Sequence, residues 1–346
     1  MLLISESRVR TNLQRMADRA RRHGIALRPH AKTHQSLVVS QWMKEYGITE
    51  IAVTGVRMAA RLLPGDWERM TIAMPVNTGE SHFKELDRLA EHSRLTVFIT
   101  SLATAHALRE FAPDRVDAYV ELDAGYGRSG VDFREEALLA ELISVIGPDR
   151  FRGFYVHSGH TYGAASLVEI GGIHQELLSA FARVRAYPAT PAGCEYVTGD
   201  TPACSSQEDF TGVTAIGPGN FVYYDLVQTG LGACTAEQIA ICYAAPVLEV
   251  HANRKEVIVH AGWVQLGKDQ LPDGTFGRLV RLQNDKWESP VPDASMIRLS
   301  QEHGTATLPA DWLAELRPGD LVGILPVHAC AAVHGALATG EQRIVP

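Results

Sequence analysis

The chain has 346 residues, more than one ordinary domain needs, and its 46% hydrophobic and 21% charged residues are typical of a globular protein rather than a disordered or fibrous one. Its 32 Lys and Arg residues against 40 Asp and Glu residues give a formal charge of -8, so no excess of cations is present to neutralise the phosphates of a nucleic acid or an anionic membrane. No apolar run is long enough to span a bilayer, and five scattered cysteines are typical of a reduced protein, so we expect a soluble cytoplasmic enzyme.

The first two-thirds of the chain alternate between helical and strand patterns. The N-terminus turns polar after four residues, which excludes a signal peptide, and a helix is expected over residues 5–23. Further helical periods cover residues 35–46, 80–92 and 133–146. The strand candidates are residues 25–27, 50–53, 70–74, 95–99, 118–122, 151–156, 196–198 and 213–216. Eight strands that alternate with helices predict a parallel (β/α)₈ barrel.

The pattern changes after about residue 235. Residues 246–251 and 257–260 carry β-branched runs, and turn sequences follow at residues 272–274 and 317–320. We therefore predict a C-terminal β-rich domain over residues 235–346, after a barrel over residues 1–234.

The first candidate for chemistry is Lys32, in the sequence RPHAKTH at residues 28–34, directly after the first predicted strand. Active sites of such barrels are built where strands end, and the flanking histidines and arginine predict positive charges that favour a neutral, nucleophilic amine. An ordinary surface lysine in a loop has the same spacing, so the residues alone leave both interpretations open.

The glycines of residues 123–130, after the fifth strand, permit close backbone approach to a ligand, and glycine-rich loops at residues 198–202 and 217–220 end the seventh and eighth strands. Late barrel loops of this kind hold phosphate groups through backbone N–H groups, although glycines also simply make tight turns. Tyr155, His157, His160 and Tyr162 gather after the sixth strand, where a flat ring could stack or accept a hydrogen bond.

His328 and Cys330 lie in an apolar stretch of β character, residues 324–333. Alternate residues of a strand project to the same face, so imidazole and thiolate could bind one metal ion, and this pair favours zinc. Two ligands leave open positions, as in catalytic zinc sites. A buried cysteine beside an unrelated histidine is the alternative.

Taken in order, six motifs over nearly the whole chain resemble the family of D-threonine aldolase and eukaryotic-type D-serine dehydratase, which are fold-type III pyridoxal phosphate enzymes with an alanine-racemase-like barrel. The motifs are RPHAKTH at residues 28–34, GRSG at 127–130, TGDTP at 198–202, PGNFVYYD at 218–225, EHG at 302–304 and PVHAC at 326–330. Three residues depart from the family pattern. Asp200 replaces the second glycine of the phosphate loop, Val327 replaces an asparagine, and Val264 stands where a lysine is common.

The resemblance implies pyridoxal 5'-phosphate bound as a Schiff base to Lys32, a divalent metal, foremost Zn²⁺, on His328 and Cys330, and a homodimer. The cofactor-binding residues that it implies are Lys32, His30, Arg128, Tyr155, His157, Tyr162, Thr198, Gly199, Thr201, Gly219 and Asn220. The implied reaction is dehydration of a D-3-hydroxy amino acid, such as D-serine, to a 2-oxo acid and ammonia, with Lys32 as base. Two alternatives stay open: aldol cleavage to glycine and an aldehyde, and a protein that binds pyridoxal phosphate without catalysis.

Overall fold

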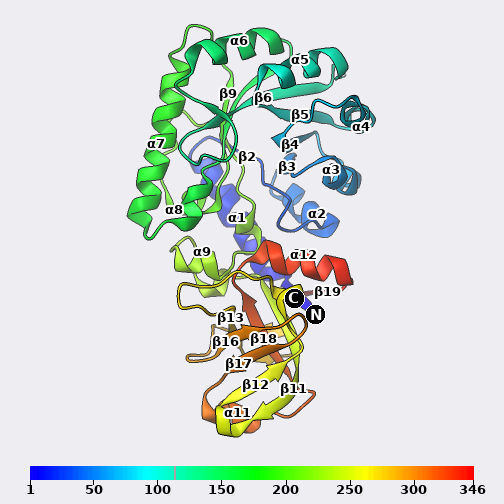
Figure 1. Ribbon diagram of the computed structural model, residues 1–346, viewed down its shortest axis with the longest axis vertical. Coiled ribbons are helices and arrows are strands. Elements are labelled where there is room, and N and C mark those ends of the chain that lie inside the picture. Colours follow the sequence, from blue (N-terminus) through cyan, green and yellow to red (C-terminus); the bar gives the residue numbers. More distant parts are fainter. Residues whose placement is uncertain (113) are drawn as a thin grey trace. The chain divides into compact units, whose positions relative to one another are not determined.

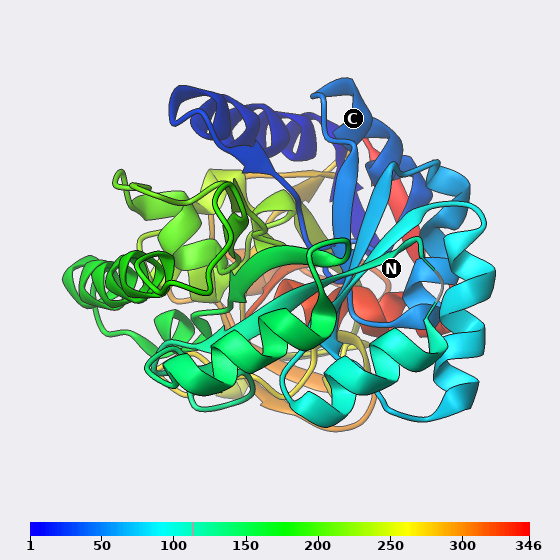
Figure 2. The ribbon, with the colours of Figure 1, turned by 90° about the horizontal axis from the view of Figure 1, so that it is seen from above.

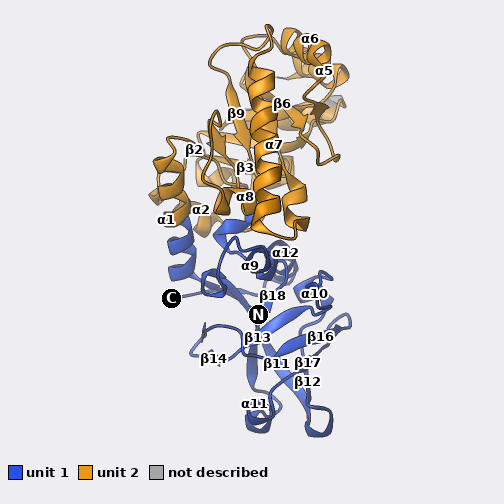
Figure 3. Ribbon diagram, turned by 90° about the vertical axis from the view of Figure 1, so that its left-hand side faces the viewer, with its two compact units in different colours: residues 1–13, 220–346 blue, residues 14–219 orange. Residues whose placement is uncertain are grey.

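A computed structural model describes residues 1–112 and 114–346 (Figure 1). The chain divides into two compact units, Met1–Leu13 with Asn220–Pro346, and Gln14–Gly219 (Figure 3). We describe each unit by itself. Among the described residues, no helix is both long and apolar enough to cross a membrane.

The unit Gln14–Gly219 contains a nearly closed parallel barrel. Its strands are β2 (Ala26–Leu27), β3 (Glu50–Val53), β4 (Arg69–Pro75), β5 (Arg94–Ile99), β6 (Val116–Asp123), β8 (Phe151–Val156), β9 (Glu195–Thr198) and β10 (Ala215–Ile216). They are ordered β2-β10-β9-β8-β6-β5-β4-β3, and a parallel bridge between His30 and Ala52 links the two ends of this order. The short β7 (Val131–Asp132) pairs with β6. All eight predicted strands are confirmed, with ends that differ by no more than two residues.

Helices follow the strands and lie around them when the barrel is seen from above (Figure 2). They are α1 (Glu6–Arg22, which begins in the other unit), α2 (Leu37–Glu45), α3 (Val56–Leu62), α4 (Glu80–Ala90), α5 (Leu102–Phe111), α6 (Glu136–Ile146), α7 (Leu167–Arg185) and α8 (Thr201–Ser206), with 3₁₀ turns η1 (Leu63–Gly65) and η2 (Gly159–Gly163). A serine caps three of them at the N-terminus: the hydroxyls of Ser36, Ser101 and Ser166 accept the N–H of the third residue of α2, α5 and α7. Local sequence thus sets where these helices begin.

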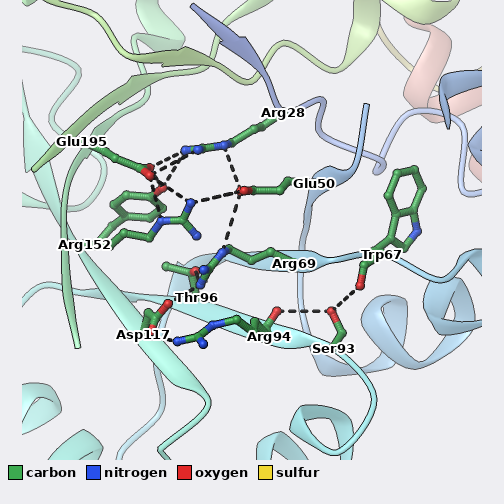
Figure 4. Close-up of polar contacts among 11 residues, drawn as sticks. Arg28, Glu50, Trp67, Arg69, Ser93, Arg94, Thr96, Asp117, Arg152 and Glu195 are labelled. Atoms are coloured by element: carbon green, nitrogen blue, oxygen red, sulfur yellow. Dashed lines mark hydrogen bonds and ion pairs between the residues drawn. The ribbon is translucent and has the colours of Figure 1, made fainter. Parts of the chain in front are cut away.

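The barrel interior is layered. Paired charges fill its N-terminal end (Figure 4): Arg28 Nε lies 2.9 Å from Glu50, Arg152 Nη2 lies 2.9 Å from Glu195, and Arg69 pairs with Asp117. An aromatic and aliphatic layer follows, made by Phe98, Tyr119, Tyr155, Val197 and Ala215. The loops that carry the predicted site residues lie beyond these layers, at the carboxyl ends of the strands, where barrel enzymes build their active sites.

The other unit is a β-rich domain, as predicted. Its sheet is ordered β12-β17-β16-β13-β18-β11-β1-β19, with a further pairing of β12 with β11, and all its pairings are antiparallel except that of β1 with β19. The strands are β1 (Leu2–Ser5), β11 (Ile241–His251), β12 (Glu256–Val259), β13 (Gly277–Val280), β16 (Ser295–Leu299), β17 (Gly304–Thr307), β18 (Leu321–Pro326) and β19 (Gln342–Val345), beside a hairpin of β14 (Leu282–Gln283) and β15 (Lys286–Trp287). Its other elements are η3 (Asn220–Val222), α9 (Leu226–Gly230), η4 (Ala236–Gln238), η5 (Ala252–Arg254), α10 (Trp263–Leu266), α11 (Ala310–Glu315) and α12 (Ala329–Thr339).

The limits of the two units differ from the boundary predicted between residues 234 and 235. The N-terminal segment Leu2–Ser5 forms a strand of the β-rich unit, because it pairs antiparallel with β11 and parallel with β19. Residues 220–234 also cluster with that unit. Neither feature is visible in the local pattern, since both depend on partners more than a hundred residues away.

Candidate active site

The loop that carries Lys32 is fixed on both sides. After β2, the N–H of Arg28 donates to Ile216 O of β10 at 2.8 Å, and the N–H of His30 donates to Pro218 O at 3.1 Å. On the other side, the N–H of Ala31 donates to Ala52 O of β3 at 2.7 Å. Lys32 itself is half-buried. The lysine therefore lies at the carboxyl end of the barrel, in a loop whose backbone is part of the barrel's closure.

The histidines beside Lys32 are neutral. His30 Nδ1 accepts a hydrogen bond from the Lys32 N–H at 3.2 Å, and desolvation, followed by the charge of Lys32, lowers the pKa of His30 well below its usual value. His34 Nδ1 accepts from the Ser36 N–H at 3.1 Å, and burial lowers the pKa of His34 to about 4. Arg28 is paired with Glu50 and Glu195. The prediction that these neighbours surround the lysine with positive charge is therefore wrong, because two of them are neutral and the third is compensated.

Aromatic rings cluster with Arg128 at the ends of β6 and β8. The guanidinium carbon of Arg128 lies 5.2 Å from the Tyr126 ring centroid, and that ring stacks on His160 at 5.8 Å and meets His157 edge-on at 5.9 Å. Asp123 shapes the loop by accepting the N–H groups of Gly125 and Gly127. Tyr126 was not among the predicted site residues, although an aromatic ring between glycines after a barrel strand could have marked it.

Tyr155 and His157 connect this cluster to the late glycine loops. His157 Nδ1 donates to the carbonyl oxygen of Gly199, and desolvation lowers the pKa of His157 to about 4. Burial raises the pKa of Tyr155, whose hydroxyl occupies the space that a Cβ at Gly199 or Gly217 would need. Both side chains are therefore uncharged at neutral pH, and a tyrosine packs against two glycines of the predicted phosphate loops.

The loops after β9 and β10 offer polar groups to an anion. The hydroxyl of Thr198 is buried and has no hydrogen-bond partner among the described residues. The Thr201 N–H donates to the hydroxyl of Tyr162 at 3.2 Å. A Cβ at Gly219 would lie 2.8 Å from the carbonyl oxygen of His30. These loops thus contact the lysine loop and leave a buried hydroxyl available.

Asp200 replaces a family glycine, and its carboxylate points into the protein. Its Oδ1 accepts the Ala203 N–H at 2.8 Å, which caps α8, and the Thr161 hydroxyl at 3.0 Å, which links the loop to η2. Burial raises the pKa of Asp200 to about 6.

Three predicted site residues, Asn220, His328 and Cys330, belong to the β-rich unit, where Asp225 connects them. The buried carboxylate of Asp225 accepts from Asn220 Nδ2 at 2.6 Å and from the Ala329 N–H at 2.8 Å, beside His328. Sequence reasoning missed Asp225 as a site residue. An acidic residue that ends the apolar run FVYY was the available signal.

His328 and Cys330 are paired, but not on a strand. Strand β18 ends at Pro326, His328 is the N-cap of α12, and Cys330 lies in its first turn, so the predicted strand over residues 324–333 is wrong beyond residue 326. A hydrogen bond between the two side chains is the main cause that raises the pKa of His328 to about 9. His328 Nδ1 also lies 3.1 Å from Asp269 Oδ2. Among the described residues no three such side chains converge on one metal position, so the pair alone would leave open coordination positions.

The geometry defines a (β/α)₈-barrel enzyme with a lysine at the carboxyl end of its first strand. The family described as "Alanine racemase, N-terminal domain" matches residues 4–223, and the family described as "Putative serine dehydratase domain" matches residues 240–337. The chain belongs to the alanine racemase N-terminal domain family.

Relatives of known activity resemble the chain over most of its length. It is 27% identical to the D-threo-3-hydroxyaspartate dehydratase of Delftia sp. (strain HT23), over 95% of this chain and 90% of the relative, and 26% identical to the D-serine dehydratase of Dictyostelium discoideum, over 95% and 89%. Its fold matches the solved structure of the Delftia enzyme with a TM-score of 0.88 and 24% identity, covering 96% of this chain and 91% of the other. The similarity identifies the chain as a lyase.

Proposed function

We propose that the chain is a pyridoxal phosphate- and metal-dependent dehydratase of D-3-hydroxy amino acids, such as D-serine, which it converts to a 2-oxo acid and ammonia. The observation that carries the proposal is the fixed loop of Lys32, held between β10 and β3 and in contact with Gly219. A primary amine, a buried hydroxyl on Thr198 and glycine backbone suit a cofactor that carries an aldehyde and a phosphate, so the residues fit this group.

Different residues of the chain would bind different parts of the cofactor. Lys32 would hold the cofactor covalently, while Thr198, Gly199, Thr201, Gly219 and Asn220 would hold its phosphate. Pyridoxal phosphate, when bound, supplies an electron sink next to the substrate's Cα. His30, Tyr155, His157 and Tyr162, with Arg128, would line the ring site. Because His30 and His157 are neutral at neutral pH, they can accept or donate hydrogen bonds without adding charge to the ring site.

The proposed dehydration needs a base and a departing hydroxyl. Once the substrate's amine has replaced it on the cofactor, the freed amine of Lys32 would take the α-proton. The Cβ–O bond would break with its electron pair on oxygen, the departing hydroxide would take up a proton, and addition of water to the product would release ammonia and the 2-oxo acid. His328 and Cys330 would hold the metal, and a thiolate with an imidazole favours Zn²⁺. Such a metal supplies Lewis acidity for a departing hydroxyl.

Aldol cleavage is the second candidate. It is supported by similarity to the 3-hydroxy-D-aspartate aldolase of Paracoccus denitrificans (strain Pd 1222), 21% identical over 94% of this chain, and to the D-threonine aldolase of Arthrobacter sp, 26% identical over 62%. The two dehydratases are 27% and 26% identical over 95%. Cys330 also favours dehydration, because a thiolate with an imidazole favours Zn²⁺, which suits the role of a Lewis acid on a departing hydroxyl. The higher identity over nearly the whole chain and the cysteine together favour the dehydratase.

The deciding experiment is a product assay with D-serine, D-threonine and D-threo-3-hydroxyaspartate. The proposal expects ammonia and 2-oxo acid in equal amounts, with turnover lost after chelation and restored by Zn²⁺. Glycine and acetaldehyde from D-threonine would establish the aldolase instead. Turnover that survives complete metal removal would exclude the metal's role. Cofactor binding without turnover of any of these substrates would favour a carrier.

We also propose a cytoplasmic homodimer, to be tested by light scattering and by fractionation of cells.

A further inference from the structure

Asp200 is an isolated acidic group inside the barrel unit. It lies between β9 and α8, its side chain is 1% exposed, and it forms no ion pair with any residue that the structure describes. One of its oxygens, Oδ1, accepts two hydrogen bonds, from Ala203 and Thr161. The other, Oδ2, is buried and has no partner among the described residues. A buried carboxylate with neither a cation nor a full set of donors is costly in its charged form.

The side chains packed around Asp200 give its charge little compensation. Burial raises the pKa values of Tyr155 on β8 and Cys204 on α8, so both are neutral, and His157 after β8 is also neutral. The side chains of Thr161 and Tyr162 on η2 carry hydroxyl groups. The charge of Arg19 on α1 lowers the pKa of Cys204, but Arg19 is paired with Glu208 at 3.0 Å. The charge of Arg128 lowers the pKa values of Tyr155 and His157. Neither arginine shifts the pKa of Asp200.

The loop that Asp200 shapes is the one proposed to receive a phosphate dianion. Phosphate near a buried carboxylate adds a second negative group, and when two such groups share a site one of them takes up a proton. Oδ2 can take that proton without loss of either existing hydrogen bond, since both are made by Oδ1. Protonation of Oδ2 removes the negative charge of Asp200 near the loop that receives the phosphate and leaves the hydrogen bonds from Ala203 and Thr161 in place.

We propose that Asp200 positions the phosphate loop in its protonated form, and that the enzyme takes up one proton at Asp200 when it binds its phosphate-bearing cofactor. This inference rests on the proposed function, because it requires pyridoxal phosphate at the loop of residues 198–201. A carboxylate at residue 200, where the family pattern has glycine, would make the affinity for the cofactor depend on pH. Burial already brings the pKa of Asp200 to about 6 in the chain without ligand, so protonation is within reach near neutral pH.

The test is a titration of the full-length chain, stripped of cofactor, with pyridoxal 5'-phosphate at pH 6, 7 and 8. Asp200→Asn keeps an acceptor at Oδ1 and carries no charge. The ratio of the wild-type dissociation constant to that of Asp200→Asn should rise about tenfold per pH unit above pH 6, because only the wild type must take up the extra proton. The ratio cancels the ionisation of the cofactor and of Lys32, which both proteins share. Asp209→Asn, at an exposed carboxylate near the same segment, should behave as the wild type.

Two further measurements make the outcome independent of the variant's folding. Calorimetry in two buffers of different ionisation enthalpy should show about one more proton taken up by the wild type than by Asp200→Asn at pH 8. In the wild type alone, infrared difference spectra should show a protonated carboxyl band when cofactor is added. A ratio that stays constant from pH 6 to pH 8 overturns the inference while the proposed function stands. Failure of both proteins to bind pyridoxal phosphate at any pH overturns the proposed function itself.

Discussion

The carbonyl oxygen of His30 lies where residue 219 has no room for a side chain: a Cβ there would be 2.8 Å from that oxygen and 3.1 Å from the His30 Cβ. The His30 N–H also donates to Pro218 O, so the two loops contact each other through their backbones. Gly219 is therefore required by the loop that carries Lys32, and not only by a ligand.

Replacing Gly219 with valine should displace the lysine loop. We expect a loss of about 1–3 kcal/mol in the free energy of unfolding, as for other overpacked sites, together with weaker binding of pyridoxal phosphate. Denaturant unfolding and cofactor titration measure the two effects. Gly172→Ala is the matched control, because nothing lies within 4 Å of a Cβ there, and it should leave cofactor affinity unchanged. Wild-type affinity in Gly219→Val would show that the two loops act independently.

Lys32→Ala should remove the covalent attachment of the cofactor and all turnover, while the far-ultraviolet circular dichroism stays that of the wild type. The backbone bonds that hold this loop do not involve the lysine side chain, so the fold should persist. The measurement is borohydride reduction followed by peptide mapping, with Lys286→Ala, on the exposed face of β15, as the control. Labelling at another lysine would refute the assignment of Lys32.

Cys330→Ala should lose the metal and the dehydratase activity together while the visible absorbance of the cofactor remains. The reason is that His328 alone is a single ligand, and the described part of the chain offers no third side chain to complete a site. Metal content by mass spectrometry and cofactor absorbance measure the two properties separately. Cys194→Ala, which removes a half-buried thiol of the barrel unit, should change neither.

Asp200→Asn should stabilise the cofactor-free chain, and the gain should depend on pH. The pKa of Asp200 is raised from 3.8 in the unfolded chain to about 6 in the folded chain, so its stabilising contribution is complete below pH 3.8 and is lost as pH rises to about 6. Asparagine does not titrate, so the difference in unfolding free energy should grow over this window by up to about 3 kcal/mol and then level off. Unfolding by urea at pH 4, 5, 6 and 7 measures it. A difference that is flat with pH would mean that Asp200 titrates normally.

The sequence predicted the barrel well because each of its strands is a short apolar segment between helices, and that signal is local. Lys32 and the glycine loops followed from their position at strand ends. The strand predicted through His328 and Cys330 failed because the apolar pattern alone does not distinguish a strand from a helix; the alanine-rich residues 329–339 and the stop at Gly340 were the local helix signals that it left out. The charges of His30 and His34 also could not be predicted, since their pKa values are set by burial, which depends on the whole fold.

Strand β1 gives the polypeptide an unusual order of assembly. Leu2–Ser5 pairs in parallel with β19 at Gln342–Val345, so β1 finds that partner only after all of the chain between the two strands has been made. All of Gln14–Gly219 is synthesised in between, as an insertion within a discontinuous unit. The barrel can complete its own strand pairings before β19 has been made, whereas the sheet that contains β1 and β19 cannot. Substitutions in β1 and in β19 would therefore act on the same side of the same sheet.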